Sequence, residues 1–403
     1  MRHAWAGIDI GKGHHHVVVI DSEGEQLLSQ KVINDEPELL AVLDKALGLA
    51  EKITWAVDIR TGGAALVLAL LAAQDQEVLY ISSTMVNRAA GGYRGAAKTD
   101  ARDAAIIADQ ARMRRGLTVI RPHEEDVVEL RLLVARRLDL VADRTRMINR
   151  LREILLELWP ALERTLDLTN HGPLVLLVGY QRPAEVRRLG VARLAAWLKA
   201  RGVRRFNVLA ATAVEAAKAQ TVALPGERMA SQLVAQLAQD LIALEERIDA
   251  VVQMIEERFH QHELAEIVQS LPGVGPILGA EFLAAIGGNL RDFAHAGHLA
   301  AHAGMSPVPR DSGRISGNMH RPHRYSRPLN RVFYMSALLS IRSDPESRRF
   351  YDRKRAEGKG HIQAVIALGR RRVNVLWALI RDGRCYDPTR SAQNRMVMTT
   401  QAA

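Results

Sequence analysis

The chain has 403 residues, 48% of them hydrophobic and 25% charged, which allows two or three globular domains and excludes a disordered protein. No apolar segment reaches the roughly 18 residues of a membrane-spanning helix, and no signal-peptide core follows Met1. The single cysteine, Cys385, excludes a disulfide framework. We therefore expect a cytoplasmic protein without a membrane partner. The formal net charge of +10 favours polyanions, and nucleic acid is the partner that we expect.

The first 120 residues alternate between strand and helix patterns. Three β-rich segments come first, and short apolar helices and strands then follow one another. The expected strands are residues 4–10, 15–20, 26–32, 54–58 and 78–81, and the expected helices are residues 37–47, 63–73 and 99–115. This order predicts an α/β domain over residues 1–120.

Four aspartates lie at the ends of these elements. Asp9 and Asp58 each end an apolar strand, and Asp100 and Asp103 lie one turn apart at the start of a helix. Any one of them is more often a strand end or a helix cap than a ligand. Together they can converge on one point, and convergent carboxylates in a basic protein are typical of divalent-metal sites that act on phosphodiesters. The pattern therefore predicts one site made by the four acids.

The N-terminal pattern resembles the ribonuclease-H-like fold and, within it, the RuvC-type nucleases. In that fold the first and fourth strands are neighbours, each delivers a carboxylate at its end, and the last helix supplies further acids. One alternative stays open, because Gly7-Ile-Asp-Ile-Gly11 is also similar to the first phosphate loop of sugar kinases, actin and chaperone ATPases. The acid pair on the helix and the basic charge favour nucleic acid over an ATP-dependent enzyme.

The middle of the chain, residues 121–262, contains two long amphipathic helix patterns. They cover residues 124–158 and 227–260, and their apolar stripes predict an antiparallel coiled coil, within one chain or between subunits. A small helical insert without an assigned function is expected at about residues 161–226. Arginine outnumbers acid on the first long helix, which favours contacts with a nucleic-acid backbone over a merely solvated face. The arginines assigned to this contact are Arg131, Arg136, Arg137, Arg144, Arg146 and Arg150.

The C-terminal region, residues 263–385, is expected to be mainly helical, and residues 386–403 to form a flexible tail. Leu271-Pro-Gly-Val-Gly275 before an apolar helix resembles a helix–hairpin–helix, whose turn amides can face a phosphate. Ser312 and Ser316 each precede a glycine in a basic segment, where arginines can offset phosphate charge. The arginines assigned to nucleic-acid binding here are Arg310, Arg314, Arg321, Arg324 and Arg327.

Nearly the whole chain resembles the DEDD transposases of bacterial insertion sequences (the insertion-sequence family one-ten), described as bridge-RNA-guided recombinases. The resemblance rests on the RuvC-like domain with its acids, the coiled coil, the Leu-Pro-Gly-Val-Gly motif and an Ala-Gly-x-x-Pro…Ser-Gly segment. It implies that Asp9, Asp58, Asp100 and Asp103 hold Mg²⁺ and that Ser312 forms a phosphoserine link to DNA. The chain departs from the family pattern at Asp58, where glutamate is usual, and near residues 326–331, where a Gly-Asn-x-x-Leu-Arg element is only partly visible.

The resemblance also implies the partners. The nucleic-acid partners are the DNA of the element ends and of the target, and a structured noncoding guide RNA. The protein partners are further copies of the chain, in a dimer that assembles to a tetramer with a shared active site. The expected location is the nucleoid. The alternative function is a RuvC-like, metal-dependent DNA junction nuclease that uses water, in which Ser312 only contacts phosphate. A non-catalytic nucleic-acid-binding protein is a third class, which four intact acids disfavour.

Overall fold

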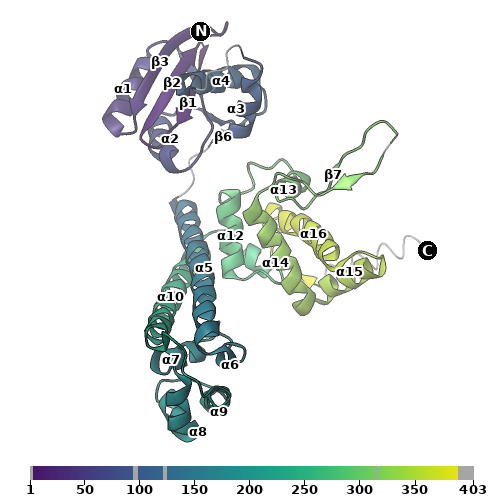
Figure 1. The fold of residues 1–403 in the computed structure, drawn as a ribbon. Helices are drawn as coiled ribbons and strands as arrows, with labels where there is room; N and C mark the ends of the chain where they lie inside the picture. Colours follow the sequence, from purple (N-terminus) through teal and green to yellow (C-terminus); the bar gives the residue numbers. More distant parts are fainter. Residues whose placement is uncertain (1–2, 94–98, 121–124, 315, 389–403) are drawn as a thin grey trace, which may run out of the picture. The chain divides into compact units, whose positions relative to one another are not determined.

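The computed structural model describes residues 3–93, 99–120, 125–314 and 316–388. The chain divides into two compact units, Met1–Glu124 and Glu125–Ala403 (Figure 1). The three-domain division expected from the sequence stays a prediction, and so does the flexible tail, since residues 389–403 lie outside the described residues. Within the described ranges, every helix is too short or too polar to cross a membrane.

The first unit is built on one six-stranded sheet with the order β3-β2-β1-β4-β5-β6. β1 pairs antiparallel with β2 and parallel with β4, so the first and fourth strands are neighbours, as expected. β6 pairs antiparallel with β5 and was not expected, because three residues are too few to show a strand period. The strands are β1 (His3–Ile10), β2 (His14–Ile20), β3 (Gln26–Ile33), β4 (Lys52–Val57), β5 (Val78–Tyr80) and β6 (Thr118–Ile120).

Helices cover both faces of this sheet, which gives a mixed α/β unit of three layers (Figure 1). Ile8 of β1 packs in the core on one face with α1 (Glu36–Leu47) and α2 (Ala65–Ala73). α4 (Asp100–Met113) and α3 (Ser83–Ala90) pack on the other face. The short helix α3 was not expected, because it buries only one hydrophobic side chain and shows no clear apolar period.

The second unit begins with two long helices, α5 (Glu125–Leu158) and α10 (Glu227–Gln261), which pack along each other (Figure 1). Leu130 near the start of α5 shares a buried core with Phe259 near the end of α10. Leu155 at the other end of α5 shares a second core with the first half of α10. The expected antiparallel packing is therefore confirmed as a helix pair within one chain, with a core at each end.

Four shorter helices form the expected insert around the second core. The buried indole of Trp159 anchors them, because its N–H donates to the carbonyl of Ala216 at 3.2 Å. The helix expected from residue 191 is the part of α8 that follows a break at Gly190, whose φ of 75° lies in the left-handed region. The helices are α6 (Pro160–Glu163), α7 (His171–Gly179), α8 (Pro183–Lys199) and α9 (Phe206–Lys218).

The rest of the second unit is mainly helical, as expected, and shares the first core with α5 and α10. The Leu-Pro-Gly-Val-Gly segment is the turn between α11 and α12, and it packs against α14. A Cβ at Gly273, whose φ is +77°, would lie only 2.8 Å from the carbonyl oxygen of Ser336. The elements are α11 (Ala265–Ser270), α12 (Pro276–Ile286), α13 (Ala296–His302), β7 (Val308–Pro309), β8 (Met319–His320), α14 (Arg327–Ser343), α15 (Pro345–Ala356) and α16 (His361–Arg381).

Candidate functional site

Asp9 and Asp58 lie at the same edge of the sheet. Ile8 of β1 and Val57 of β4 are partners in the parallel register, and each aspartate is the next residue along its chain. Both carboxylates are half-buried. The pairing of the first and fourth strands therefore brings two acids together that are far apart in the sequence.

Helix α4 packs against the face of β1 that carries Asp9. Gly7 is in contact with this helix, because a Cβ at Gly7 would overlap the carbonyl oxygen of Ala104. Side chains two residues apart on a strand point to the same face, so Asp9 projects to the α4 side as a Gly7 side chain would. Asp103 directly precedes Ala104 and lies in the first turn of α4.

The same geometry places Asp58 on the α4 side of the sheet. Ala56 is the register partner of Gly7 and packs with Ile106 of α4. Asp58 lies two residues after Ala56, so its side chain leaves the sheet on that face. Burial is the main cause that raises the pKa of Asp58, and the negative charge of Asp103 on α4 acts in the same direction.

Asp58 has an electrostatically unfavourable position. The Ser83 hydroxyl donates to its Oδ2 at 2.9 Å, whereas Oδ1 is buried and has no hydrogen-bond partner among the described residues. Burial raises the pKa of Asp58, the hydrogen bond from Ser83 and the nearby backbone N–H groups of Asp58 and Ile10 act in the opposite direction, and the charge of Asp103 adds a smaller upward effect. A buried carboxylate oxygen without a partner is costly, and a cation bound there would remove that cost.

Asp100 approaches the same edge from the start of α4. The Thr99 side chain caps this helix by accepting from the Arg102 N–H at 3.2 Å, and Asp100 is the first helical residue. Burial lowers the pKa of His16, while the negative charge of Asp100 acts to raise it. His16 is the register partner of Asp9, so Asp100 lies near the strand pair that carries Asp9.

The four acids gather at one edge but do not form a closed metal site. In the part of the chain that the structure describes, no three histidine, cysteine, aspartate or glutamate side chains lie close enough to hold one ion. The buried Oδ1 of Asp58 fits a cation ligand by its chemistry, and carboxylate oxygens are the ligands that Mg²⁺ prefers. The arrangement is therefore an open cluster of acids rather than a formed metal cage.

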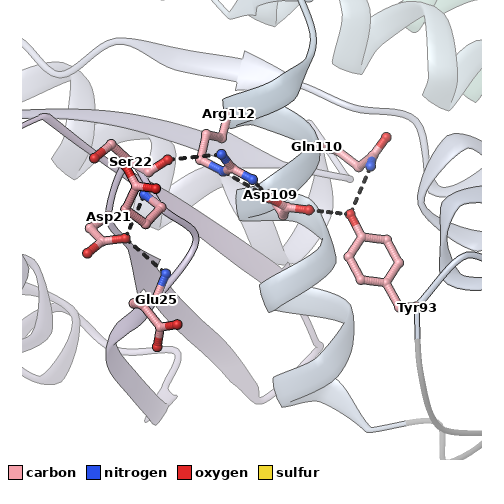
Figure 2. Close-up of polar contacts among 8 residues, drawn as sticks. Asp21, Ser22, Glu25, Tyr93, Asp109, Gln110 and Arg112 are labelled. Atoms are coloured by element: carbon pink, nitrogen blue, oxygen red, sulfur yellow. Dashed lines mark hydrogen bonds and ion pairs between the residues drawn. The ribbon is translucent and has the colours of Figure 1, made fainter.

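A polar network that the sequence did not reveal holds α4 in place (Figure 2). The Tyr93 hydroxyl donates to Asp109 Oδ2 at 2.6 Å and accepts from Gln110 Nε2 at 3.0 Å. Arg112 donates to Asp109 Oδ1 through Nε and Nη2, at 3.0 and 2.7 Å, and to the carbonyl of Ser22 at 2.9 Å. Burial raises the pKa of Tyr93, and its hydrogen bond to Asp109 adds to this effect. The network joins the β2–β3 turn, the segment that follows α3 and the last turns of α4.

Ser83 is a second residue that the sequence reasoning missed. It is the first residue of α3 and supports the carboxylate of Asp58 directly. The signal for it was present, because Ser82 and Ser83 follow the short strand β5, and serine is common at helix starts. No sequence pattern indicated Tyr93. Its partner Asp109 lies in the second half of α4, away from the helix start where side-chain caps are expected.

Ser312 and Ser316 lie in the loop of the β7–β8 hairpin, which stands out from α13–α16 in Figure 1. Backbone and side-chain bonds close the base of this loop: the Arg310 N–H donates to the carbonyl of Asn318, and the Asn318 N–H donates to Asp311 Oδ1, each at 2.9 Å. Both serines are exposed, as are Arg310, Arg314, Arg321, Arg324 and Arg327. Ile315, between the two serines, lies outside the described residues.

The arginines of α5 fall into two groups. Arg144 is paired with Glu245 of α10 at 2.9 Å, Arg137 lies 3.6 Å from the buried Glu281 of α12, and Arg146 is paired with Asp143. The other assigned arginines, Arg131, Arg136 and Arg150, make no ion pair with a described residue. Arg144 and Arg137 therefore link α5 to α10 and α12, and Arg146 is paired only within α5, whereas the second group presents unpaired positive charge.

Comparison with known proteins identifies transposase sequences at both ends of the chain. The model of the DEDD transposases of the IS110 type matches residues 6–160, a range that includes all four acids. The model of the transposase IS116/IS110/IS902 family matches residues 265–352, a range that includes Ser312.

Full-length relatives agree with these matches. A 42 kDa protein of insertion element IS900 from Mycobacterium paratuberculosis is 53% identical over 387 residues, which are 95% of this chain and 97% of the relative. A 44.8 kDa protein of insertion element IS116 from Streptomyces clavuligerus is 51% identical over 95% of this chain and 96% of the relative. The mini-circle putative transposase for IS117 from Streptomyces coelicolor is 28% identical over 89% of each chain. The chain therefore belongs to the IS116/IS110/IS902 family of transposases, enzymes that cut and rejoin DNA.

Proposed function

We propose that this transposase cuts and rejoins DNA at a RuvC-like site formed by Asp9, Asp58, Asp100 and Asp103, together with Ser312. The observation that carries the proposal is the gathering of the four acids at one edge of the sheet, on the face against which α4 packs. The strand order with neighbouring first and fourth strands supports the RuvC-like assignment. The family match supports DNA as the substrate.

The four carboxylates would hold a divalent cation, for which Mg²⁺ is the proposed ion, once they draw closer together than in the open cluster described above. Bound there, the ion would supply charge neutralisation at a phosphate and lower the pKa of a coordinated oxygen. The buried, unpartnered Oδ1 of Asp58 and the charge of Asp103 beside it support this assignment. Ser83 would keep its hydrogen bond to Asp58 Oδ2 and so fix the direction in which the carboxylate points.

Ser312 is the proposed nucleophile. Its Oγ would form a bond to a DNA phosphorus, the P–O bond to one sugar would break, and the serine proton would pass to solvent or a base while the released sugar oxygen takes up a proton. A hydroxyl of another strand would then attack the phosphoserine and restore serine. Because the covalent link keeps the phosphodiester energy, no ATP is needed. The exposed loop among five exposed arginines supports an accessible hydroxyl near phosphate.

The acids lie in the first unit and Ser312 in the second, so the proposal requires that these parts meet within one subunit or between subunits. We include a homo-oligomer, a dimer that assembles to a tetramer, and a structured guide RNA in the proposal. The unpaired arginines of α5, Arg131, Arg136 and Arg150, are the proposed backbone contacts on that helix.

Covalent trapping tests the proposal. Labelled DNA that carries element ends is incubated with the full chain in Mg²⁺, and the mixture is separated by denaturing electrophoresis. We expect a DNA–protein adduct that disappears in Ser312→Ala. Cleavage without any adduct would instead support the water-using junction nuclease.

A further inference from the structure

We propose that the turn between α8 and α9 is a separate nucleic-acid-binding surface, at which Lys199, Arg201, Arg204 and Arg205 hold a sugar–phosphate backbone. The inference rests on the proposed function, since a transposase complex brings nucleic acid to the chain. The surface belongs to the helical insert, at the opposite end of the α5–α10 pair from the C-terminal helices. Leu130 and Leu155 belong to the two separate cores and are about 37 Å apart along α5.

The charge of this segment is one-sided. No acidic residue occurs between Glu185 and Glu215. The stretch contains seven basic residues, namely Arg187, Arg188, Arg193, Lys199, Arg201, Arg204 and Arg205. Four of these seven fall within residues 199–205, and all four are exposed. Such a run raises the local positive potential without an internal counter-charge and favours a polyanion.

The folded chain leaves three of the four charges of the turn unused. Lys199, Arg204 and Arg205 form no ion pair and no side-chain hydrogen bond with a described residue, although Lys199 lies 5.7 Å from the ring of Phe206. Arg187, by contrast, donates to the carbonyls of Ala217 and Gln220 and so has a structural role. The basic residues of the turn are therefore available to an outside partner.

An aromatic platform holds one of the arginines in a fixed position. The guanidinium of Arg201 lies 3.8 Å from the centre of the Trp197 ring, and Tyr180 packs edge-on against the same ring at 5.0 Å. Gly179 provides the necessary room, because a Cβ there would overlap Trp197. Arg201 Nη1 donates to the carbonyl of Trp197 at 3.3 Å, and the other N–H groups of this exposed, stacked guanidinium can donate to the oxygens of a phosphate.

The position of Arg204 and Arg205 disfavours a purely structural role. They directly precede α9, whose first turn has no acidic residue and whose N-terminus receives no side-chain cap. Cations at the start of a helix oppose the helix dipole and destabilise the fold. Two arginines at such a place reduce stability, and neutralisation by phosphates would offset that loss.

Binding measured in EDTA tests the surface without any catalytic turnover. The full chain is titrated against a duplex DNA and an RNA hairpin of arbitrary sequence, over a series of salt concentrations. In Arg204→Ala/Arg205→Ala we expect the slope of log K against log[salt] to be shallower by about 1.8 for duplex DNA or about 1.4 for RNA regions that bind as single strands. The probe that shows the change identifies the nucleic acid. Lys218→Ala/Arg228→Ala is the control, because it removes the same charge from exposed positions at the end of α9, where Lys218 pairs with Glu215, and at the start of α10.

Two further measurements separate the outcomes. Arg204→Lys/Arg205→Lys keeps the charge and should keep most of the salt slope, and the melting temperature of the double alanine variant should equal or exceed that of the parent chain. An unchanged salt slope with both probes, or an equal change of the slope in the control variant, would contradict the proposal that this turn binds nucleic acid. Ser312→Ala should bind as the parent chain does, so a failure of the proposed catalysis leaves this assay intact.

Discussion

Gly7 and Ala104 lie in backbone contact across the interface between β1 and α4. No side chain fits between them, because a Cβ on Gly7 would overlap the carbonyl oxygen of Ala104 and the amide nitrogen of Ala108. This close approach brings the first turn of α4, with Asp100 and Asp103, to the strand that carries Asp9. The glycine therefore sets the separation between the strand acid and the helix acids.

The first prediction follows from this contact. Gly7→Ala should lower the free energy of unfolding by about 1–3 kcal/mol, because the added methyl group must push α4 away from the sheet. Gly13→Ala is the control, since nothing lies within 4 Å of a Cβ there, and it should change stability by less than about 0.5 kcal/mol. Urea denaturation of both variants measures the difference. Equal stability of the two variants would show that α4 does not depend on the contact.

The second prediction concerns the network around Tyr93 in Figure 2. Tyr93→Phe removes the hydrogen bonds to Asp109 and Gln110 and should cost about 1 kcal/mol, because Asp109 is half-buried and Gln110 is buried. Tyr80→Phe is a suitable control, since the Tyr80 hydroxyl makes no hydrogen bond to a described residue. Amide hydrogen exchange in α4 should rise in Tyr93→Phe alone. If the two variants lose equal stability, the network does not hold the helix.

Most helices and strands of the first unit could be predicted, because the spacing of apolar residues that indicates each of them lies within its own short segment. The strand that contains Asp9 and the helix that begins at Asp100 both appear in the sequence as clear patterns. The pairing of β1 with β4 is not local, and it could be expected only from the resemblance to a known fold. The contact of Gly7 with Ala104 could not be predicted at all, since a glycine in a strand has several possible reasons.

The arginines of α5 show a different limit of sequence reasoning. An excess of arginine over acid on one helix does not by itself indicate unpaired charge, because neighbouring helices can supply the acidic partners. Arg144 finds Glu245 on α10, and Arg137 approaches Glu281 on α12. These acids lie more than a hundred residues away in the sequence, so the sequence of α5 alone cannot separate paired from unpaired arginines.

The third prediction tests the acid cluster through binding rather than activity. At a Mg²⁺ concentration about ten times Kd, binding to the folded state should add about 1.4 kcal/mol of stability, seen as a rise in melting temperature. Asp58→Asn should lose this rise while staying folded without the ion, because it removes a buried charge. Asp44→Asn, on the exposed side of α1, should keep the rise. A full rise in Asp58→Asn would exclude Asp58 from the metal site.

The fourth prediction concerns Arg372, which holds the turn between α11 and α12. This arginine is buried and donates to the Ser336 hydroxyl at 2.7 Å and to the carbonyl of Pro272. Burial lowers its pKa to about 10, so the guanidinium stays charged at neutral pH. Arg372→Met should cost about 2–4 kcal/mol, because the buried Ser336 hydroxyl and the partly buried Pro272 carbonyl lose their donor.

Arg371 provides the control for this change, because it is the adjacent residue and is exposed. Arg371→Met should change the free energy of unfolding by less than about 1 kcal/mol, as expected for a surface cation near the Phe350 ring. Chemical denaturation monitored by tryptophan fluorescence compares the two. Similar losses in both variants would mean that the turn is held by the packing of Gly273 on α14 rather than by Arg372.

The last prediction concerns the nucleophile, and it separates two serines of one loop. Ser312 and Ser316 are both exposed, and each precedes a glycine with positive φ, 53° at Gly313 and 76° at Gly317. Local exposure and backbone freedom therefore do not distinguish them. Ser312 directly follows Asp311, whose carboxylate accepts from the Asn318 N–H at the base of the loop, and it is the serine that the family resemblance assigns as nucleophile.

Ser312→Ala should abolish both the covalent DNA adduct and recombination, because no other hydroxyl would occupy the attacking position. Binding of DNA should be retained, since the surrounding arginines are unchanged. Ser316→Ala is the matched control and should still form the adduct. Denaturing electrophoresis of labelled DNA, followed by peptide mapping of the linked serine, measures both. An adduct that persists in Ser312→Ala and disappears in Ser316→Ala would move the nucleophile four residues along the loop, and loss in neither variant would leave water as the attacking group.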